Sequence, residues 1–324
     1  MRKLGYLARA LSVFTLTILV GSIAMAQQAT TWVAQDGDDA SPTCSFTAPC
    51  KTFASAVSKT SNQGQLITKT GGNFGPVTIT QSITINALGA TTGIQVPNNA
   101  NAITISTSVI GDVVHLSGLN INGSHQGGTP SALFTGIVFN GIGALVVENT
   151  NIENFSNGGI NFAPAAGGGE LYVRDSTITN NEFFGIQAAS NTSGNAFVSI
   201  DTTRLTNNGR YATGSALSLG SRTLGAIRDS VISGSGGVGV AAQPAAGTSL
   251  FNVESTLIHN NGNGILAGYA AGLATVRISN STIVDNSGAG FSYTGGSNVI
   301  SLGSNKVSGN GAGNGPPSGV VAQQ

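Results

Sequence analysis

The stretch VRDSTITNNEFFGI at residues 173–186 recurs as VESTLIHNNGNGI at 253–265 and as ISNSTIVDNSGAGF at 278–291. One apolar residue in each copy serves as an anchor, and successive anchors are 24 to 27 residues apart. The anchors are Ile152, Ile178, Leu205, Ile232, Ile258, Ile283 and Val307. A period in this range is typical of a solenoid, in which each repeat forms one coil and stacks on its neighbours.

Each repeat contains three short strand-like pieces separated by Gly and Asn turns. Leucine-rich repeats have a similar period, but these copies are poor in leucine. The pattern therefore predicts an all-β fold, a right-handed parallel β-helix. Alternation places the residues five and seven before each anchor in the core, together with a residue about eight after it. The predicted inward residues are Leu145, Val147, Leu171, Val173, Val198, Ile200, Phe251, Val253, Val276 and Ile278, followed by Ile160, Ile186, Val240, Ile265 and Phe291.

Two polar columns accompany the anchors. Ser or Thr stands two residues before the anchor, at Thr150, Ser176, Thr203, Ser230, Thr256 and Ser281. Asn or Asp stands two residues after it, at Asn154, Asn180, Asn207, Asn260 and Asp285. We expect these hydroxyls and amides to hydrogen-bond from coil to coil and to hold the turns.

The composition agrees with this fold. Only 8% of the chain is charged and 47 of its 324 residues are glycine, which disfavours a helical protein. Hydrophobic residues make up 40% of the chain, which argues against disorder.

The first 26 residues have the features of a cleaved signal peptide. Arg2, Lys3 and Arg9 precede an apolar run, and Ala24-Met25-Ala26 is a small-residue cleavage site. The predicted mature chain has ten basic and thirteen acidic residues, so we expect no nucleic-acid partner. The apolar run is short for a membrane span, and no second one follows. The sequence thus predicts export, to the periplasm or the outside of the cell.

The mature chain is expected to have three parts. Residues 27–65 form an N-terminal cap with a short helix, on which Phe53 and Val57 share one side, and with a loop that a Cys44–Cys50 disulfide closes. Residues 66–312 form the β-helix, and 313–324 a flexible tail. Insertions around SHQGGTPSALFTG, which begins at Ser124, and at GRYATG (209–214) are expected to form flanking loops, where binding often resides.

These features together resemble the pectin-lyase-like right-handed β-helix proteins. WVAQDGDDASPTCSFTAPCKTFASAV (32–57), followed by FGPVTITQSITINALG (74–89), is similar to the N-terminal region of secreted bacterial members. GLNINGS and the NSTIVDN-type copies are similar to their coils. The resemblance covers most of residues 31–310 and implies the fold, while leaving the activity open, because the superfamily includes lyases, hydrolases, esterases and members without known chemistry.

The catalytic motifs that this resemblance implies are missing from the sequence. Lyases of the family use an Arg or Lys base and calcium held by clustered carboxylates, but the only dense acidic group here is DGDD at 36–39, in the capping loop. The NTD, paired-Asp, Gly-His-Gly and Arg-x-Lys motifs of the polygalacturonase-like hydrolases are absent, as is the esterase signature. His115, His125 and His259 have no spacing that suggests a metal site. We therefore expect no cofactor and no metal, with calcium only in the case of a lyase.

One outward column is the candidate binding site. The residues four before successive anchors alternate in charge, and Tyr172 and Arg277 are predicted to project from the same face. The column is Glu148, Arg174, Asp201, Arg228 and Glu254, and ends at Ser279. In stacked coils these charges would form an external ion-pair ladder, which is compatible with a merely solvated face or with a site for a sugar chain. Asp201, between Arg174 and Arg228, would stay ionised, which suits binding better than proton transfer.

Three functions remain open from the sequence. The first is an exported, non-enzymatic β-helix that binds polysaccharide or another surface polymer along the charged face. The second is a divergent polysaccharide lyase or glycoside hydrolase that acts on an acidic glycan with residues of that face or of the inserted loops. The third is a purely structural surface rod without a ligand.

Overall fold

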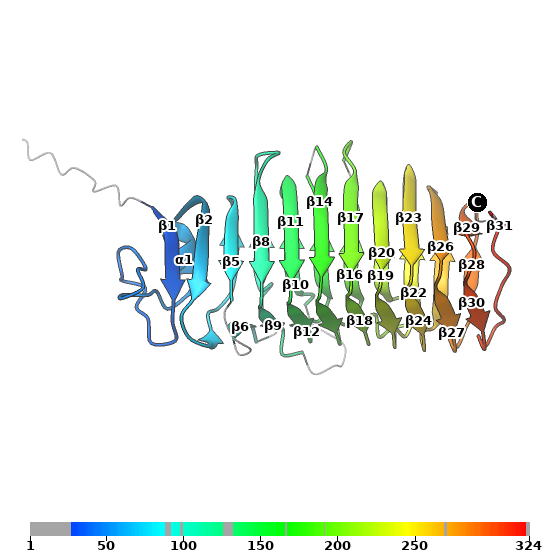
Figure 1. The fold of residues 1–324 in the computed structure, drawn as a ribbon, viewed down its shortest axis with the longest axis horizontal. Coiled ribbons are helices and arrows are strands. Elements are labelled where there is room, and N and C mark those ends of the chain that lie inside the picture. Colours follow the sequence, from blue (N-terminus) through cyan, green and yellow to red (C-terminus); the bar gives the residue numbers. More distant parts are fainter. Residues whose placement is uncertain are drawn as a thin grey trace, which may run out of the picture.

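The chain winds into a rod of three parallel sheets, and the strands of each sheet follow one another along the long axis (Figure 1). The structure is a computed structural model that describes residues 27–87, 92–97, 100–125, 132–165, 167–190, 192–268 and 271–321. The predicted signal peptide, residues 1–26, lies outside these ranges. The all-β, right-handed parallel β-helix is thereby confirmed.

Each coil from β2 to β28 contributes one strand to each sheet, and the ends of the rod add β1, β29, β30 and β31. Sheet A contains β1 (Gln28–Val33), β2 (Thr60–Thr68), β5 (Ile83–Asn86), β8 (Val113–Ser117), β11 (Gly143–Glu148), β14 (Gly169–Arg174), β17 (Ala196–Asp201), β20 (Thr223–Arg228), β23 (Thr248–Glu254), β26 (Leu273–Ser279), β29 (Asn298–Ser301) and β31 (Gly319–Val320). Sheet B contains β3 (Gly72–Asn73), β6 (Thr92–Gln95), β9 (Asn120–Asn122), β12 (Asn151–Glu153), β15 (Thr177–Thr179), β18 (Arg204–Thr206), β21 (Val231–Ser233), β24 (Leu257–His259), β27 (Thr282–Val284) and β30 (Lys306–Ser308). Sheet C contains β4 (Val77–Ile79), β7 (Ile103–Ile105), β10 (Thr135–Phe139), β13 (Gly158–Phe162), β16 (Phe184–Ala188), β19 (Ser215–Leu219), β22 (Val238–Ala242), β25 (Asn263–Ala267) and β28 (Phe291–Tyr293).

The anchors stack in one column through sheet B. Ile152 pairs with Ile178, Ile178 with Leu205 and Leu205 with Ile232, and the same register continues to Val307. All anchors but the last are fully buried. The predicted inward residues of sheets A and C are buried as well, and only three of these inward residues are exposed by a few per cent. Sheet C adds Leu217 between Ile186 and Val240, a position that the insertion at 209–214 conceals in the sequence. Apolar side chains of one coil are therefore covered by those of the next.

Left-handed backbone makes the two corners around each short strand of sheet B. The residue three before the anchor has a positive φ, as at Asp175 (49°), and so has the residue two after it, as at Asn180 (56°). Asn and Asp tolerate this conformation better than other residues with a side chain, which explains their recurrence. The predicted Ser/Thr column lies just inside the first corner and is buried. In it, the backbone N–H of Thr150 donates to Ser176 Oγ of the next coil at 3.2 Å, and Thr203 and Ser230 repeat this contact at 3.0 Å.

The asparagine ladder lies one residue later than the sequence predicts. The column two after the anchor, which includes Asn180 and Asn207, forms the exposed corner itself, whereas the buried amides that stack are three after the anchor. Asn208 Oδ1 accepts from Asn181 Nδ2 at 2.8 Å, and Asn208 Nδ2 donates to the carbonyl of Ile178 at 2.7 Å. The ladder is formed by Asn181 and Asn208, then Asn261, Asn286 and Asn310, with Ser235 between the two groups. The expectation of stacked amides is confirmed, but their position was wrong.

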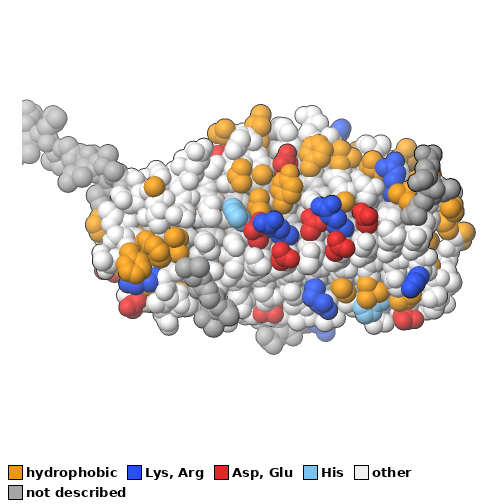
Figure 2. Space-filling model, in the orientation of Figure 1, with side chains coloured by type: hydrophobic (Ala, Val, Ile, Leu, Met, Phe, Trp, Pro, Cys, Tyr) orange, Lys and Arg blue, Asp and Glu red, His pale blue; other side chains and the backbone are white. Residues whose placement is uncertain are grey.

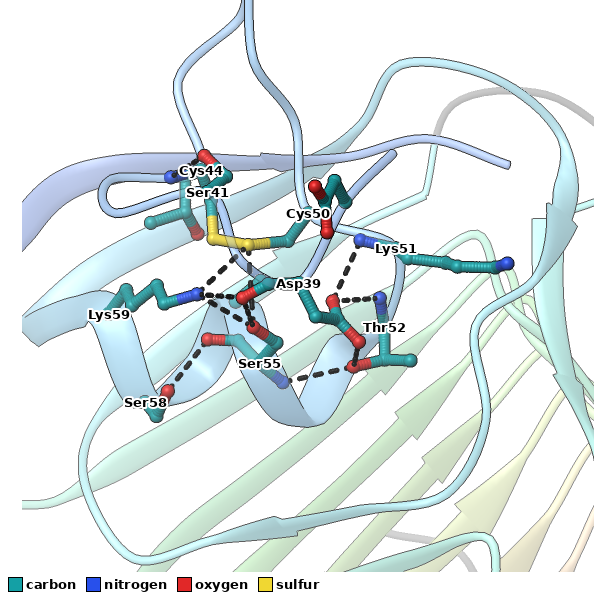
Figure 3. The surroundings of a disulfide bond; sticks show 12 residues. Asp39, Ser41, Cys44, Cys50, Lys51, Thr52, Ser55, Ser58 and Lys59 are labelled. Carbon is teal, nitrogen blue, oxygen red and sulfur yellow. Dashed lines mark hydrogen bonds between the residues drawn. A yellow bond between two sulfur atoms is a disulfide. The ribbon is translucent and has the colours of Figure 1, made fainter. Parts of the chain in front are cut away.

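The N-terminal cap is held by one helix, one carboxylate and one disulfide. Helix α1 (Phe53–Lys59) buries Phe53 and Val57 against the first coil, as predicted. Asp39 binds the start of this helix, because its Oδ1 accepts from the backbone N–H groups of Lys51 and Thr52, both at 2.9 Å (Figure 3). Burial alone would raise the pKa of Asp39, but these hydrogen bonds outweigh it and lower the pKa. The DGDD group therefore has a structural role at this aspartate.

The disulfide between Cys44 and Cys50 forms as expected, and both residues are fully buried. Lys59 Nζ, from the end of α1, lies 3.5 Å from Cys50 Sγ and donates to the carbonyl of Asp39 at 2.8 Å (Figure 3). The loop and the helix are thus joined into one unit over the first coil.

The expected boundaries differ from the structure at both ends of the β-helix. The cap boundary at residue 65 falls inside β2, which already pairs with β5 as part of sheet A. Within the expected tail, β31 pairs with β29, and Ser318 N–H donates to the carbonyl of Val299 at 2.8 Å. In the described part of the chain, no helix has the length and apolar character that a membrane crossing requires.

Asn208→Ala should destabilise the rod more than Asn207→Gly, although the two residues are adjacent. The first change removes three buried hydrogen bonds, two from N–H groups of Asn181 and one to the carbonyl of Ile178, which should lower the free energy of unfolding by about 3 kcal/mol. The second keeps the left-handed corner and should cost about 1 kcal/mol or less. Urea unfolding of both variants measures the difference. Equal losses would contradict the assignment of the ladder.

Replacing both cysteines, as Cys44→Ala/Cys50→Ala, should loosen the cap alone. Opening a loop of this length costs about 2 kcal/mol in chain entropy, and the coils of a solenoid depend mainly on their direct neighbours. Hydrogen exchange should therefore speed up in α1 and stay unchanged in the coil 173–186. Faster exchange in both regions would show that the cap stabilises the whole rod.

Candidate functional site

The predicted charged column lies in register on the outer face of sheet A. Glu148 pairs with Arg174, Arg174 with Asp201 and Asp201 with Arg228, and the register continues through Glu254 to Ser279. Figure 2 shows these red and blue side chains as a row across the middle of the rod, with hydrophobic side chains directly above them. The stacking that sequence periodicity predicted is therefore present.

The row consists of two separate ion pairs, where a continuous ladder was expected. Arg174 Nη2 lies 2.7 Å from Glu148 Oε1, and Arg228 Nε binds Asp201 Oδ1. Among the described residues, no salt bridge joins Arg174 to Asp201 or Arg228 to Glu254, although their charges are close enough to raise the pKa of the two arginines further. The hydrogen bonds to Glu148 and Asp201 are the main cause of these raised pKa values. The side chains of both arginines are more than half exposed, so each has N–H donors that can reach a ligand.

His115 joins this face, which the sequence did not indicate. It lies beside Val146 in the register, and its Nε2 is 3.2 Å from Glu148 Oε2. Glu148 is thereby enclosed between His115 and Arg174, and only 13% of its side chain is exposed. Burial would raise the pKa of Glu148, but the hydrogen bond from Arg174 and the charge of His115 outweigh it and lower the pKa. This carboxylate is held ionised, which suits a structural role in the face better than the release and uptake of a proton.

Tyr172 and Arg277 share the outer face of sheet A, as predicted, but they are not neighbours. They occupy one column, in which Tyr172 is followed by Ser199, Ala226 and Asn252 before Arg277 is reached. The two side chains are thus four strands apart, on the order of 19 Å. Tyr172 is 43% exposed and its hydroxyl donates to Glu170 Oε2 at 2.8 Å, an interaction that raises the pKa of Tyr172. Arg277 is only partly exposed, so Tyr172 belongs to the centre of the face and Arg277 to its end.

A third column of outward residues is largely apolar, and it was missed in the sequence. It stands eight residues before the anchors and consists of Val113, Ala144, Glu170, Phe197, Leu224, Leu250 and Thr275. Phe197, with 48% exposure, and Tyr172 border a shallow groove of about 400 Å³ that continues over Leu224 to Leu250. An aromatic and aliphatic shelf thus runs along the row of charges, and we call the two together the sheet A face. A continuous patch of exposed apolar side chains marks a binding surface more often than an exposed polar surface does.

The described residues contain no group of three or more His, Cys, Asp and Glu side chains that could hold a metal ion.

Comparisons with known proteins agree with this architecture. A family model described as "Right handed beta helix region" matches residues 135–312. The solved structure of pectate lyase Pel9A is similar, with a TM-score of 0.54, 13% identity, and coverage of 86% of this chain and 69% of that one. The A-module of the mannuronan C-5 epimerase AlgE4 from Azotobacter vinelandii is more distant, with a TM-score of 0.36, 12% identity, and coverage of 81% and 91%. Comparison with curated proteins finds no match.

The Glu148→Gln substitution should lower the free energy of unfolding of the protein at neutral pH. In acid, it should have no such effect. Because the folded pKa of Glu148 lies below its ordinary value of 4.5, its stabilising contribution is present above that value and disappears as the pH falls through the folded pKa. Urea midpoints of wild type and variant should therefore differ at pH 7 and converge toward pH 3. Glu254→Gln, which removes a carboxylate that forms no salt bridge with the described residues, should shift the midpoint less. A Glu148→Gln difference that is independent of pH would contradict the pairing.

Proposed function

We propose, on the premise that this chain belongs to the family of right-handed β-helix proteins, that it binds polysaccharide along the sheet A face. The observation that carries the proposal is the exposed shelf of Tyr172 and Phe197 next to Arg174 and Arg228. Aromatic rings offer flat apolar surface for the C–H faces of sugar rings, and guanidinium groups donate paired hydrogen bonds to hydroxyl or carboxylate oxygens.

The geometry of the face suits a long polymer better than a small molecule. The strands of sheet A repeat every ~4.8 Å along the rod, so equivalent side chains form straight columns with shallow relief. An extended glycan can lie along these columns and contact several coils at once, and many weak contacts then add up. The row contains opposite charges that largely cancel, so we do not attribute binding to long-range attraction.

Binding without catalysis is the simplest function for this arrangement. Proton transfer requires a group with a pKa suited to the task, in a cleft that excludes water. The carboxylates of Glu148 and Asp201 are instead neutralised by arginines, and Asp201 remains 30% exposed. The alternative of a divergent lyase or hydrolase is tested by the same experiment, as is the structural rod without ligand.

We further propose that the protein is exported, to the periplasm or beyond the cell. The signal peptide predicted at residues 1–26 supports this, together with the buried disulfide of the cap, because disulfides persist in oxidising compartments. Polysaccharides of cell envelopes and of the surroundings would then be within reach.

Affinity electrophoresis in gels that contain polygalacturonate, alginate or a neutral glucan should show retardation by at least one polymer. Pectate is the first choice, because the similar structure is named a pectate lyase. Tyr172→Ala/Phe197→Ala should weaken retention about tenfold, since each ring contact contributes roughly 0.5–1.5 kcal/mol. Arg174→Gln/Arg228→Gln should weaken it as well. Arg204→Gln, an exposed arginine on sheet B, is the matched control and should have no effect.

Two other outcomes decide between the alternatives. Growth of ultraviolet absorbance from unsaturated products, or release of reducing ends, would replace the binding proposal by a lyase or a hydrolase. No retardation by any polymer would favour the structural rod.

A further inference from the structure

A second cleft lies at the corner between sheets B and C, away from the sheet A face. It has a volume of about 400 Å³, within the range of small-ligand sites, and we call it the corner cleft. Its walls include the left-handed corner residues Asn180 and Asn207, and Glu182 is buried beside them. His125 and Arg210 complete it, and each belongs to one of the two insertions that interrupt the repeat.

The carboxylate of Glu182 contacts both His125 and Arg210. Its side chain is only 4% exposed, and its Oε1 lies 3.1 Å from His125 Nε2 and 3.2 Å from Arg210 Nη1. The backbone N–H of Arg210 donates to the carbonyl of Glu182 at 2.8 Å, so the arginine is fixed at its main chain too. Next to them, the rings of Phe183 and Tyr211 pack with centroids 5.3 Å apart. Glu182 is therefore a positioning residue, which holds Arg210 at the cleft.

The second oxygen of this carboxylate lacks a hydrogen-bond donor. Glu182 Oε2 is buried and has no partner in the part of the chain that the structure describes. A buried acceptor without a donor is unfavourable and rare in folded proteins, so this oxygen requires an explanation. A ligand hydroxyl that reached Glu182 Oε2 from the cleft would supply the missing donor.

The two corner amides point to the kind of ligand. Asn180 and Asn207 occupy equivalent places in successive coils, with φ of 56° and 53°, and both residues are exposed. Within the described ranges, neither side chain has a hydrogen bond to protein, so each offers both a donor and an acceptor. Gly234 follows in the same column, and a Cβ there would overlap Asn207 Oδ1, so the glycine leaves room for this amide.

We propose that the corner cleft binds a neutral sugar unit through its hydroxyl groups. Asn180 and Asn207 stand at equivalent places in neighbouring coils, which repeat every ~4.8 Å, so their amides are near enough to bind two hydroxyls of one sugar ring. The exposed Arg210 adds donors, and a sugar hydroxyl that reaches Glu182 is itself a donor. The charges of Glu182 and Arg210 cancel, which favours a neutral ligand. A carboxylate or phosphate would gain from Arg210, but it has no donor for Glu182 and is repelled by it.

This site is independent of the polysaccharide proposed for the sheet A face. It lies on another flank and uses other residues, so either proposal can fail without the other.

Side-chain amide signals in nitrogen-15 NMR spectra test the proposal directly. Titration with D-glucose, D-galactose and D-xylose should shift the NH₂ signals of Asn180 and Asn207 for at least one of these sugars. Asn180→Gly/Asn207→Gly should weaken that binding about tenfold or more, because two hydrogen-bonding amides are removed. The column already contains Gly234 with a φ of 74°, so glycine fits the corner backbone.

Two controls separate the site from its surroundings. Asn260→Gly changes an equivalent corner residue, with a φ of 53°, that does not line the cleft, and it should leave binding unchanged. Arg174→Gln/Arg228→Gln, which removes arginines of the sheet A face, should also leave it unchanged. The proposal is overturned if no neutral sugar shifts the two amide signals, if D-galacturonate binds more tightly than D-galactose, or if Asn260→Gly weakens binding equally.

Discussion

Every coil of this protein depends on the coil before and after it for the burial of its apolar side chains. A single coil has an inward residue or two per strand and no second layer to cover them, so stacking in exact register is the only way to bury them. Register in turn requires that each corner turn at the same residue. The left-handed corners, the buried hydroxyls and the amide ladder provide this, because each satisfies backbone groups of the neighbouring coil. The outer columns, where binding is proposed, are straight only because the inner ones are.

Much of this could be predicted from the sequence, since the period fixes which residues stack. The anchors, the inward residues and the register of Glu148, Arg174, Asp201 and Arg228 follow from counting alone. The predicted position of the asparagine ladder was wrong by one residue. The motif contains two adjacent asparagines, and counting does not reveal which of them forms the corner. The prediction of a continuous ion-pair ladder failed for another reason. Each arginine pairs with only one of its two neighbouring carboxylates, and counting does not reveal which one.

The candidate sites were harder to predict, because they depend on residues that break the repeat. The apolar column is interrupted by Glu170, so its members do not look alike in the sequence. His115 comes from an early coil without a clear copy of the motif, yet the fold places it next to Glu148. His125, Glu182 and Arg210 are up to 85 positions apart, and only the winding of the chain brings them to one carboxylate. Counting along the sequence gave no sign that His125 and Arg210, one from each insertion, would meet at Glu182.

The central functional claim is that a polysaccharide lies along the outer face of sheet A, and paramagnetic broadening tests it most directly. A spin-labelled oligogalacturonate, or the polymer that binds best, would be added to protein with labelled methyl groups. The account predicts broadening of the methyl signals of Val146, Leu224 and Leu250, which face outward on sheet A, and none at Val138 and Leu266, which face outward on sheet C. Broadening confined to sheet C, or spread evenly over the rod, would contradict it.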